Sequence, residues 1–365
     1  MSASASETEV LSRAPAEGSA TPTDVVEPTI IRYHSTFRKV LSFTIFPGMM
    51  VSTMSIYFWF VNRGYWPPVV IFCISFVAMI VLTILEIVHP YSRYWVPHRH
   101  DVYADAIHMF TSELVPYHLY QFLFNGLLVA ASHKLHARLG FDPWPHHWPI
   151  LLQLALLLVL MEFSQTSFHW ATHRFPILWR IHQVHHSSPK LYWLASIRFH
   201  PTENWLAAMA MVTPVVLIGA NIEVMMAFSM FINIFGTTQH ANICMTPTPL
   251  FNYIFAMPEL HRWHHSKDVR CNYGGYLSIW DVIFGTRYMP GEREQQPDNI
   301  GIEGLTEKFP RKWFGHMLAP FQEQSQFYQP PSSEDKAAGQ GAEEEPKVAV
   351  ERGAGVAPTQ GTHGV

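Results

Sequence analysis

The sequence of residues 169–186 reads HWATHRFPILWRIHQVHH and carries five histidines at helical spacing. Two of them stand four residues apart, and the other three follow as HxxHH; the HxxHH pattern returns once at residues 261–265, in HRWHH. Positions i, i+3 and i+4 share one face of a helix, so each cluster can aim two or three imidazoles at one point. Five histidines saturate one metal ion, and eight or more imply two.

Apolar blocks of membrane-crossing length surround this stretch. Residues 40–61, 67–88, 114–132 and 149–168 are each close to the roughly 20 residues that a helix needs to cross the hydrocarbon core. The fourth block ends where the histidines begin. A further apolar run, 205–235, is interrupted by Pro214 and by a Gly-Ala-Asn turn, so we expect a tilted or half-deep helical hairpin there.

The composition is that of a membrane protein with polar ends. Charged residues make up 14% of the chain, against about 25% in soluble proteins, and hydrophobic residues make up 48%. The formal net charge of −4 provides no basic surface for nucleic acid. The three cysteines form no CxxC pair, which excludes a disulfide framework and a thiolate zinc site. We therefore predict an all-α, polytopic transmembrane bundle of about four spans plus a hairpin, with a cytosolic, histidine-rich dimetal lobe.

Five segments follow from these patterns. Residues 1–30 and 330–365 are low in complexity and cannot bury enough apolar surface to offset ordering, so we expect disordered tails. Between them we expect a transmembrane hairpin with a third span (31–148), a histidine-box domain (149–290) and a peripheral C-terminal segment (291–329). Residues 89–111 are polar, and a loop facing the lipid headgroups is their expected structure.

The order of the spans places all the clustered histidines on one side of the membrane. Four spans and a returning hairpin bring residues 169–200 and 240–290 to the side of the N-terminus. Eight basic residues lie in those segments, and three lie on the opposite face, so the positive-inside rule predicts a cytoplasmic histidine cluster. These eight are Arg174, Arg180, Lys190, Arg198, Arg262, Lys267, Arg270 and Arg287, and the three are Arg63, Lys134 and Arg138.

Ten of the 22 histidines fall between His169 and His265, which overshoots the four ligands of a structural zinc site. A single membrane-protein histidine is usually an interfacial or packing residue, whereas three boxes on one side favour a metal pair. Neutral imidazole suits zinc, copper, iron and nickel, and the boxes contain almost no carboxylates. Such an all-imidazole pair of redox metals is suited to binding dioxygen and reducing it to an oxidant.

The boxes H169-WAT-H173, H182-QV-HH186 and H261-RW-HH265, followed by NYGGYLSIWDVIFGT, resemble the fatty acid hydroxylase/sterol desaturase superfamily of membrane di-iron oxygenases. The resemblance covers about residues 90–290. It implies a bundle in the bilayer capped by a cytosolic dimetal lobe, two iron ions as cofactor, dioxygen as co-substrate and electrons from a separate carrier.

The resemblance also implies the site residues. The eight box histidines match as metal ligands: His169, His173, His182, His185, His186, His261, His264 and His265. His200, in RFHPTE, and His240, in TTQHAN, correspond to further ligands of the sterol-oxidising branches, with a supporting role behind the ligands as the alternative. Glu162 shares a helix face with His169 and is expected to orient its imidazole. Asp281 either does the same or caps a turn. No catalytic group beyond the metal ligands is expected.

The leading hypothesis is a membrane-bound, O2-dependent oxidoreductase that hydroxylates or desaturates a sterol, fatty acyl or ether-lipid chain. No dinucleotide, flavin or haem motif is present, so a ferredoxin, cytochrome or reductase is the expected electron donor. The expected location is the bacterial inner membrane or the endoplasmic reticulum. The alternatives are a membrane zinc hydrolase, which would want an HExxH motif that is absent here, and a haem-ligating carrier or metal transporter, which would place histidines inside the spans.

Overall fold

The computed structural model describes residues 8–11, 30–33, 35–245, 251–290, 297 and 299–322. Most of the two predicted tails, 1–30 and 330–365, therefore lies outside the described residues. In the first tail, β1 (Thr8–Leu11) pairs antiparallel with β2 (Ile30–Tyr33), which begins where the tail ends, and these are the strands of the described part. The long helices are α1 (Thr36–Val61), α2 (Pro67–Val88), α4 (Val115–Leu139), α5 (Ile150–Arg174), α7 (Pro201–Leu217) and α8 (Ile222–His240).

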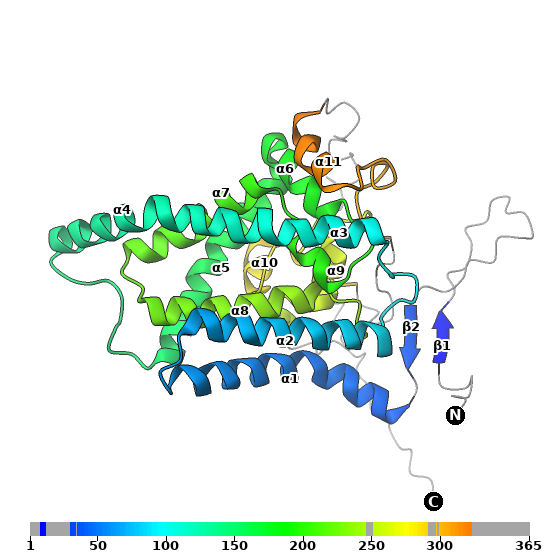
Figure 1. Cartoon of the computed structure of the whole chain (residues 1–365), viewed down its shortest axis with the longest axis horizontal. Helices are drawn as coiled ribbons and strands as arrows, with labels where there is room; N and C mark the ends of the chain where they lie inside the picture. Colours follow the sequence, from blue (N-terminus) through cyan, green and yellow to red (C-terminus); the bar gives the residue numbers. More distant parts are fainter. Residues whose placement is uncertain are drawn as a thin grey trace, which may run out of the picture. The chain divides into compact units, whose positions relative to one another are not determined.

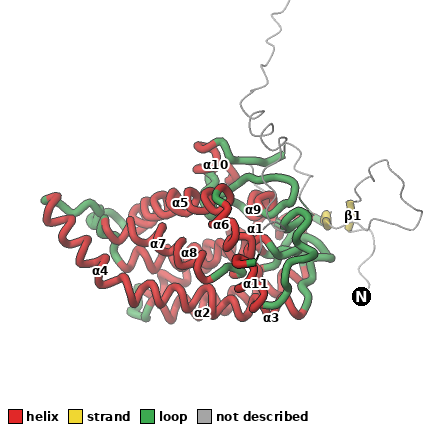
Figure 2. Tube along the Cα trace, turned by 90° about the horizontal axis from the view of Figure 1, so that it is seen from above, coloured by secondary structure: helices red, strands yellow, loops and turns green. Residues whose placement is uncertain are grey.

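Shorter helices complete the described chain. They are α3 (Arg99–His108), the π-helix η1 (Met109–Leu114), α6 (Pro176–His186), η2 (Trp193–Ile197), η3 (Phe251–Tyr253), α9 (Pro258–His264), α10 (Ile279–Phe284), α11 (Trp313–Leu318) and η4 (Ala319–Phe321). Figures 1 and 2 show that α6, α9 and α11 lie far from the C-terminal end of α4. The predicted all-α fold is confirmed.

Four helical stretches are long and apolar enough to cross a membrane: α1, α2, the continuous helix Arg99–Leu139 and α5. Their outward faces carry large apolar side chains, among them Phe72, Ile87 and Phe122, which are 71%, 74% and 86% exposed. Water would disfavour such surfaces, whereas lipid tails accept them. The prediction of a polytopic membrane protein is confirmed at this level.

The central helix of the bundle is α8. It packs against α1, α2 and α5, and Figure 1 shows it between α2 and α7. Phe235 on α8 meets Phe46 on α1 edge to face, with 4.9 Å between ring centroids. The predicted hairpin of residues 205–235 is present as α7 and α8, joined at Gly219, whose φ of 89° is one that glycine adopts without strain. This hairpin turns the chain so that α8 ends at His240.

The expected loop at residues 89–111 is wrong for residues 99–111, which are helical. Asp101, Asp105 and His108 all turn inward on α3 and are buried. Asp105 accepts from the Nε and Nη2 of Arg198 at 2.6 and 2.9 Å, and from the Tyr192 hydroxyl. A helix with a polar face forms here because that face has buried polar partners from elsewhere in the chain.

The buried pair of Asp105 and Arg198 yields a stability prediction. Asp105→Ala leaves a fully buried guanidinium without its main partner, which costs about 3–5 kcal/mol of unfolding free energy. The measurement is the unfolding free energy in detergent micelles. The matched control is Glu307→Ala, which breaks the Lys267–Glu307 pair at 3.0 Å on the surface and should change stability by less than about 1 kcal/mol. Equal losses for the two variants would contradict the prediction.

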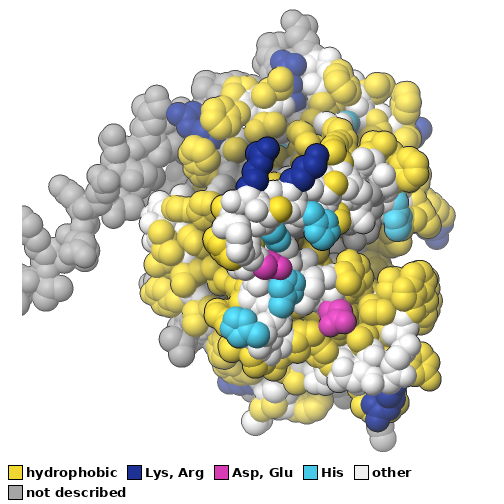
Figure 3. Space-filling model, turned by 90° about the vertical axis from the view of Figure 1, so that its left-hand side faces the viewer, with side chains coloured by type: hydrophobic (Ala, Val, Ile, Leu, Met, Phe, Trp, Pro, Cys, Tyr) yellow, Lys and Arg dark blue, Asp and Glu magenta, His cyan; other side chains and the backbone are white. Residues whose placement is uncertain are grey.

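The loop between α4 and α5 lies at the other end of α5 from the histidine boxes. Because α5 rises about 1.5 Å per residue, its two ends are about 36 Å apart, close to the thickness of a bilayer. Figure 3 looks onto this side of the molecule, where histidine and acidic side chains gather between hydrophobic ones. The Nε2 of His146 lies there 3.0 Å from the Oδ2 of Asp142.

Candidate metal centre

Nine of the ten candidate histidines converge from four helices and form two groups. The first group is His169 and His173 from the last turns of α5, His182 and His186 from α6, and His264 from α9. The second group is His185 from α6, His240 from the end of α8, and His261 and His265 from α9 and its C-terminal cap. In each group the candidate ligand nitrogens lie within 4.8 Å of one another.

The two HxxHH boxes contribute to the groups in opposite proportions. In the α6 box the i and i+4 histidines face the first group, and His185 at i+3 faces the second. In the α9 box the i and i+4 histidines face the second group, and His264 at i+3 faces the first. Each box therefore bridges both groups, which puts the two candidate metal positions side by side.

The nitrogens are spaced as ligands of one ion would be. In the first group the Nε2 of His182 lies 3.0 Å from that of His173 and 3.2 Å from that of His169. In the second group the Nε2 of His261 lies 3.0 Å from that of His240 and 3.1 Å from that of His265. Two nitrogens each about 2.1 Å from one metal stand about 3 Å apart when they subtend a right angle at it.

The hydrogen-bond partner of each Nδ1 determines which nitrogen of that imidazole carries the hydrogen. The Nδ1 of His169 faces the carbonyl of Tyr273 at 2.7 Å, and that of His264 faces the carbonyl of Cys271 at 2.8 Å. A carbonyl accepts only, so each Nδ1 carries the hydrogen and each Nε2 presents a lone pair. Lone pairs that meet at 3 Å without a proton between them repel, and a cation between them removes the repulsion. The donor set therefore fits metal ions.

Electrostatics keep the cluster neutral. Burial, together with the neighbouring imidazoles, holds the pKa well below its usual range for the six histidines of the two HxxHH boxes. Neutral imidazole is the metal-binding form.

One loop supplies the carbonyls of Tyr273 and Cys271 that face His169 and His264. Between Cys271 and Tyr273, Asn272 adopts a φ of 54°, and its amide donates to the carbonyls of Leu260 and Tyr288 at 3.0 and 2.8 Å. Asparagine tolerates this left-handed conformation better than most residues. A Cβ on the following Gly274 would lie 2.6 Å from the Leu277 carbonyl, so the loop closes only with glycine there. The NYGG motif thus sets the orientation of two histidines.

The two predicted supporting carboxylates hold this loop and do not touch an imidazole. Glu162 accepts from the backbone N–H of Tyr276 at 2.8 Å. Asp281 accepts from the N–H groups of Tyr273 and Gly274 at 2.7 and 2.8 Å, the turn-capping alternative. Asp281 thus holds the backbone of Tyr273, and the carbonyl of Tyr273 faces the Nδ1 of His169.

His200 is the one candidate that the structure does not bring into either group. It caps the N-terminus of α7, where its Nδ1 accepts from the N–H of Thr202 at 3.2 Å. The residue that sequence reasoning missed is Glu203, three positions later, whose Oε1 lies 2.5 Å from the Nδ1 of His182. The HPTE motif was the available signal, but its glutamate and not its histidine reaches the cluster.

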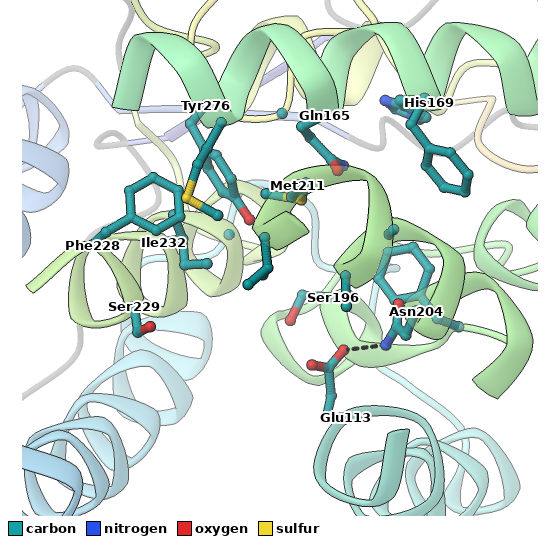
Figure 4. Close-up of a pocket in the computed structure, with 18 of the residues that line it drawn as sticks. Glu113, Gln165, His169, Ser196, Asn204, Met211, Phe228, Ser229, Ile232 and Tyr276 are labelled. Atoms are coloured by element: carbon teal, nitrogen blue, oxygen red, sulfur yellow. Dashed lines mark hydrogen bonds between the residues drawn. The ribbon is translucent and has the colours of Figure 1, made fainter. Parts of the chain in front are cut away.

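A cavity of about 300 Å³ leads to the two groups. His169 and His182 of the first group and His185, His240 and His261 of the second line its inner end. Its other walls are largely apolar and come from the facing sides of α7 and α8, with Met211, Phe228 and Ile232 visible in Figure 4. The cavity is therefore bordered by apolar side chains of these helices and by the histidines.

Comparison with known proteins identifies the same region. The fatty acid hydroxylase family model matches residues 154–286. The ornithine lipid hydroxylase OlsE of Rhizobium tropici is 34% identical over 49% of this chain and 53% of its own. The alkylglycerol monooxygenase of Danio rerio is 32% identical over 40% and 31%, and the methylsterol monooxygenase erg25B of Aspergillus fumigatus is 25% identical over 40% and 52%.

No solved structure gives a significant match. The chain spans about half of the length of the ornithine lipid hydroxylase and about a third of that of the alkylglycerol monooxygenase. The family match includes the first two histidine boxes, His240, the third box and the NYGG loop. The resemblance to the fatty acid hydroxylase/sterol desaturase superfamily that the histidine boxes predict is thus confirmed over this region of the chain.

Proposed function

We propose that this protein is a membrane-bound, O2-dependent lipid hydroxylase whose nine converging histidines hold two iron ions. The observation that carries the proposal is the meeting of imidazole Nε2 atoms in two adjacent groups that line one end of a largely apolar cavity. The named relatives hydroxylate or oxygenate ornithine lipid, alkylglycerol and methylsterol, which supports a lipid as substrate.

The chain's own residues have three tasks in this reaction. When bound, the iron pair would supply the reduction of dioxygen and the oxidising power for an unactivated C–H bond. Backbone carbonyls and Glu203 fix the imidazoles, so that the ligand nitrogens keep their positions. The apolar walls of α7 and α8 exclude water and hold one carbon of the lipid toward the histidines, which is catalysis by positioning.

We place the histidine side in the cytoplasm. Six exposed or partly exposed basic residues support this orientation, since Arg198 and Arg262 of the predicted eight are buried in the fold. The six are Arg174, Arg180, Lys190, Lys267, Arg270 and Arg287. A separate electron carrier would approach from that side, in a bacterial inner membrane or in the endoplasmic reticulum.

The test compares lipids from cells with and without the protein. Mass spectra should show one lipid class gaining 16 mass units only when the protein is present and oxygen is supplied. Metal analysis of the purified protein should give two iron ions per chain. One zinc per chain with oxygen-independent hydrolysis would overturn the proposal, and a loss of 2 mass units would make the protein a desaturase instead.

A further inference from the structure

Glu113 is an acid at the border of an apolar helical stretch. It lies within the continuous helix Arg99–Leu139, one residue before the predicted span 114–132. An ionisable side chain beside such a stretch is costly unless it is paired or hydrogen-bonded. Nothing in the metal centre requires Glu113, so its presence needs another explanation.

The helix is shaped locally to present this side chain. Glu113 belongs to η1, a π-helical turn, a distortion that is frequent at functional sites. Pro116 has no N–H to give to the carbonyl of Ser112, and that carbonyl accepts instead from the Asn204 side chain at 2.8 Å. The same amide nitrogen donates to Oε1 of Glu113 at 2.9 Å. Asn204 on α7 thereby fixes the carboxylate in one position.

The carboxylate faces the cavity that leads to the histidines. Glu113 and Asn204 both line it, and Figure 4 shows Glu113 reaching from η1 toward Ser196 and Asn204. The side chain is exposed, and it is one of the residues that line this cavity. Among the described residues, no lysine or arginine nitrogen is recorded within 4 Å of its carboxylate oxygens.

A second lining residue points to the same kind of ligand. Glu203 is 3% exposed, and while its Oε1 serves His182, its Oε2 has no hydrogen-bond partner in the described part of the chain. Carboxyl oxygens accept hydrogen bonds, and a carboxyl group with no lysine or arginine beside it favours a ligand that brings a positive charge. The polar side of the cavity therefore offers hydrogen-bond acceptors, and it is complementary to a ligand that carries donors and positive charge.

We propose that Glu113, held by Asn204, binds a primary ammonium group of the lipid substrate. The inference rests on the proposed function and adds a substrate class to it: cationic amino lipids rather than neutral sterols or ether lipids. The ammonium pairs with the carboxylate near Asn204, and the apolar part of the lipid lies along α7 and α8 toward Phe228 and Ile232.

The test measures binding rather than turnover. Purified full-length protein in an uncharged detergent is titrated with dodecylamine and with its neutral analogue N-dodecylacetamide, which has the same alkyl chain. Charge-assisted hydrogen bonds are about twice as strong as neutral ones, so the wild type should bind the amine about tenfold more tightly. Glu113→Gln keeps the shape and an acceptor oxygen but removes the charge, and it should bring the two affinities within about twofold.

The control is Glu223→Gln, which removes an exposed carboxylate from the first turn of α8 that does not line the cavity. It should keep the wild-type preference. An equal affinity of the wild type for both amphiphiles would overturn the proposal without any variant, and so would an unchanged preference in Glu113→Gln. Because no turnover enters the assay, amine selectivity without any lipid oxidation would refute the hydroxylase function and leave this site standing.

Discussion

His264→Ala and His185→Ala are each expected to abolish lipid oxidation while the protein still inserts into the membrane. His264 is the single contribution of the α9 box to the five-histidine group, and His185 is that of the α6 box to the four-histidine group. Each change removes a buried candidate ligand nitrogen from its group. The loss should exceed the roughly 100-fold that changes behind the ligands cost.

The two variants should differ in metal content. The four-histidine group falls to three candidate ligands in His185→Ala, whereas the five-histidine group keeps four in His264→Ala. His185→Ala should therefore lose more metal than His264→Ala. The measurements are lipid mass spectra and metal content per chain. The control is His147→Ala, on the loop at the other end of α5, which should change neither. Oxidation near the wild-type level in both ligand variants would refute the assignment of the site.

The membrane helices were predictable because their signal is local. Hydrophobic length located α1, α2 and α5 and the α7–α8 hairpin. The same criterion failed for α3, whose inward face is polar. Asp105 is buried there because Arg198, 93 residues later, reaches it. A search for apolar periodicity alone cannot find a helix whose buried face is made of ion pairs, since the partner lies far along the chain.

The histidine site shows a similar limit. Box spacing predicted that the imidazoles converge, because i, i+3 and i+4 positions share a helix face. Spacing did not predict that the i+3 member of each HxxHH box serves a different group from its neighbours. That division depends on how α6 and α9 face each other, which is a tertiary property. The resemblance suggested His240 and His200 alike, but α8 ends at the cluster, whereas His200 is occupied in capping α7.

Replacing Glu203 is the second change that we expect to have a large effect on metal affinity and lipid oxidation. Its Oε1 lies 2.5 Å from the Nδ1 of His182, and both side chains are buried. His182 is also the member of the first group whose Nε2 lies near those of three others, at 3.0 to 3.2 Å. A carboxylate behind a ligand imidazole fixes its tautomer and its ring orientation and raises its basicity. Without it, this imidazole can rotate or present the wrong nitrogen.

We therefore expect Glu203→Ala to lower metal affinity and lipid oxidation by about 10- to 100-fold. Glu203→Gln retains an oxygen that accepts from Nδ1 and should recover part of the loss, which a merely space-filling role would not predict. The measurements are equilibrium metal binding and lipid oxidation at saturating metal. Glu223→Gln again serves as the charge-matched control. Metal affinity equal to wild type in Glu203→Ala would show that the Tyr273 and Cys271 carbonyls hold the first group without help from this carboxylate.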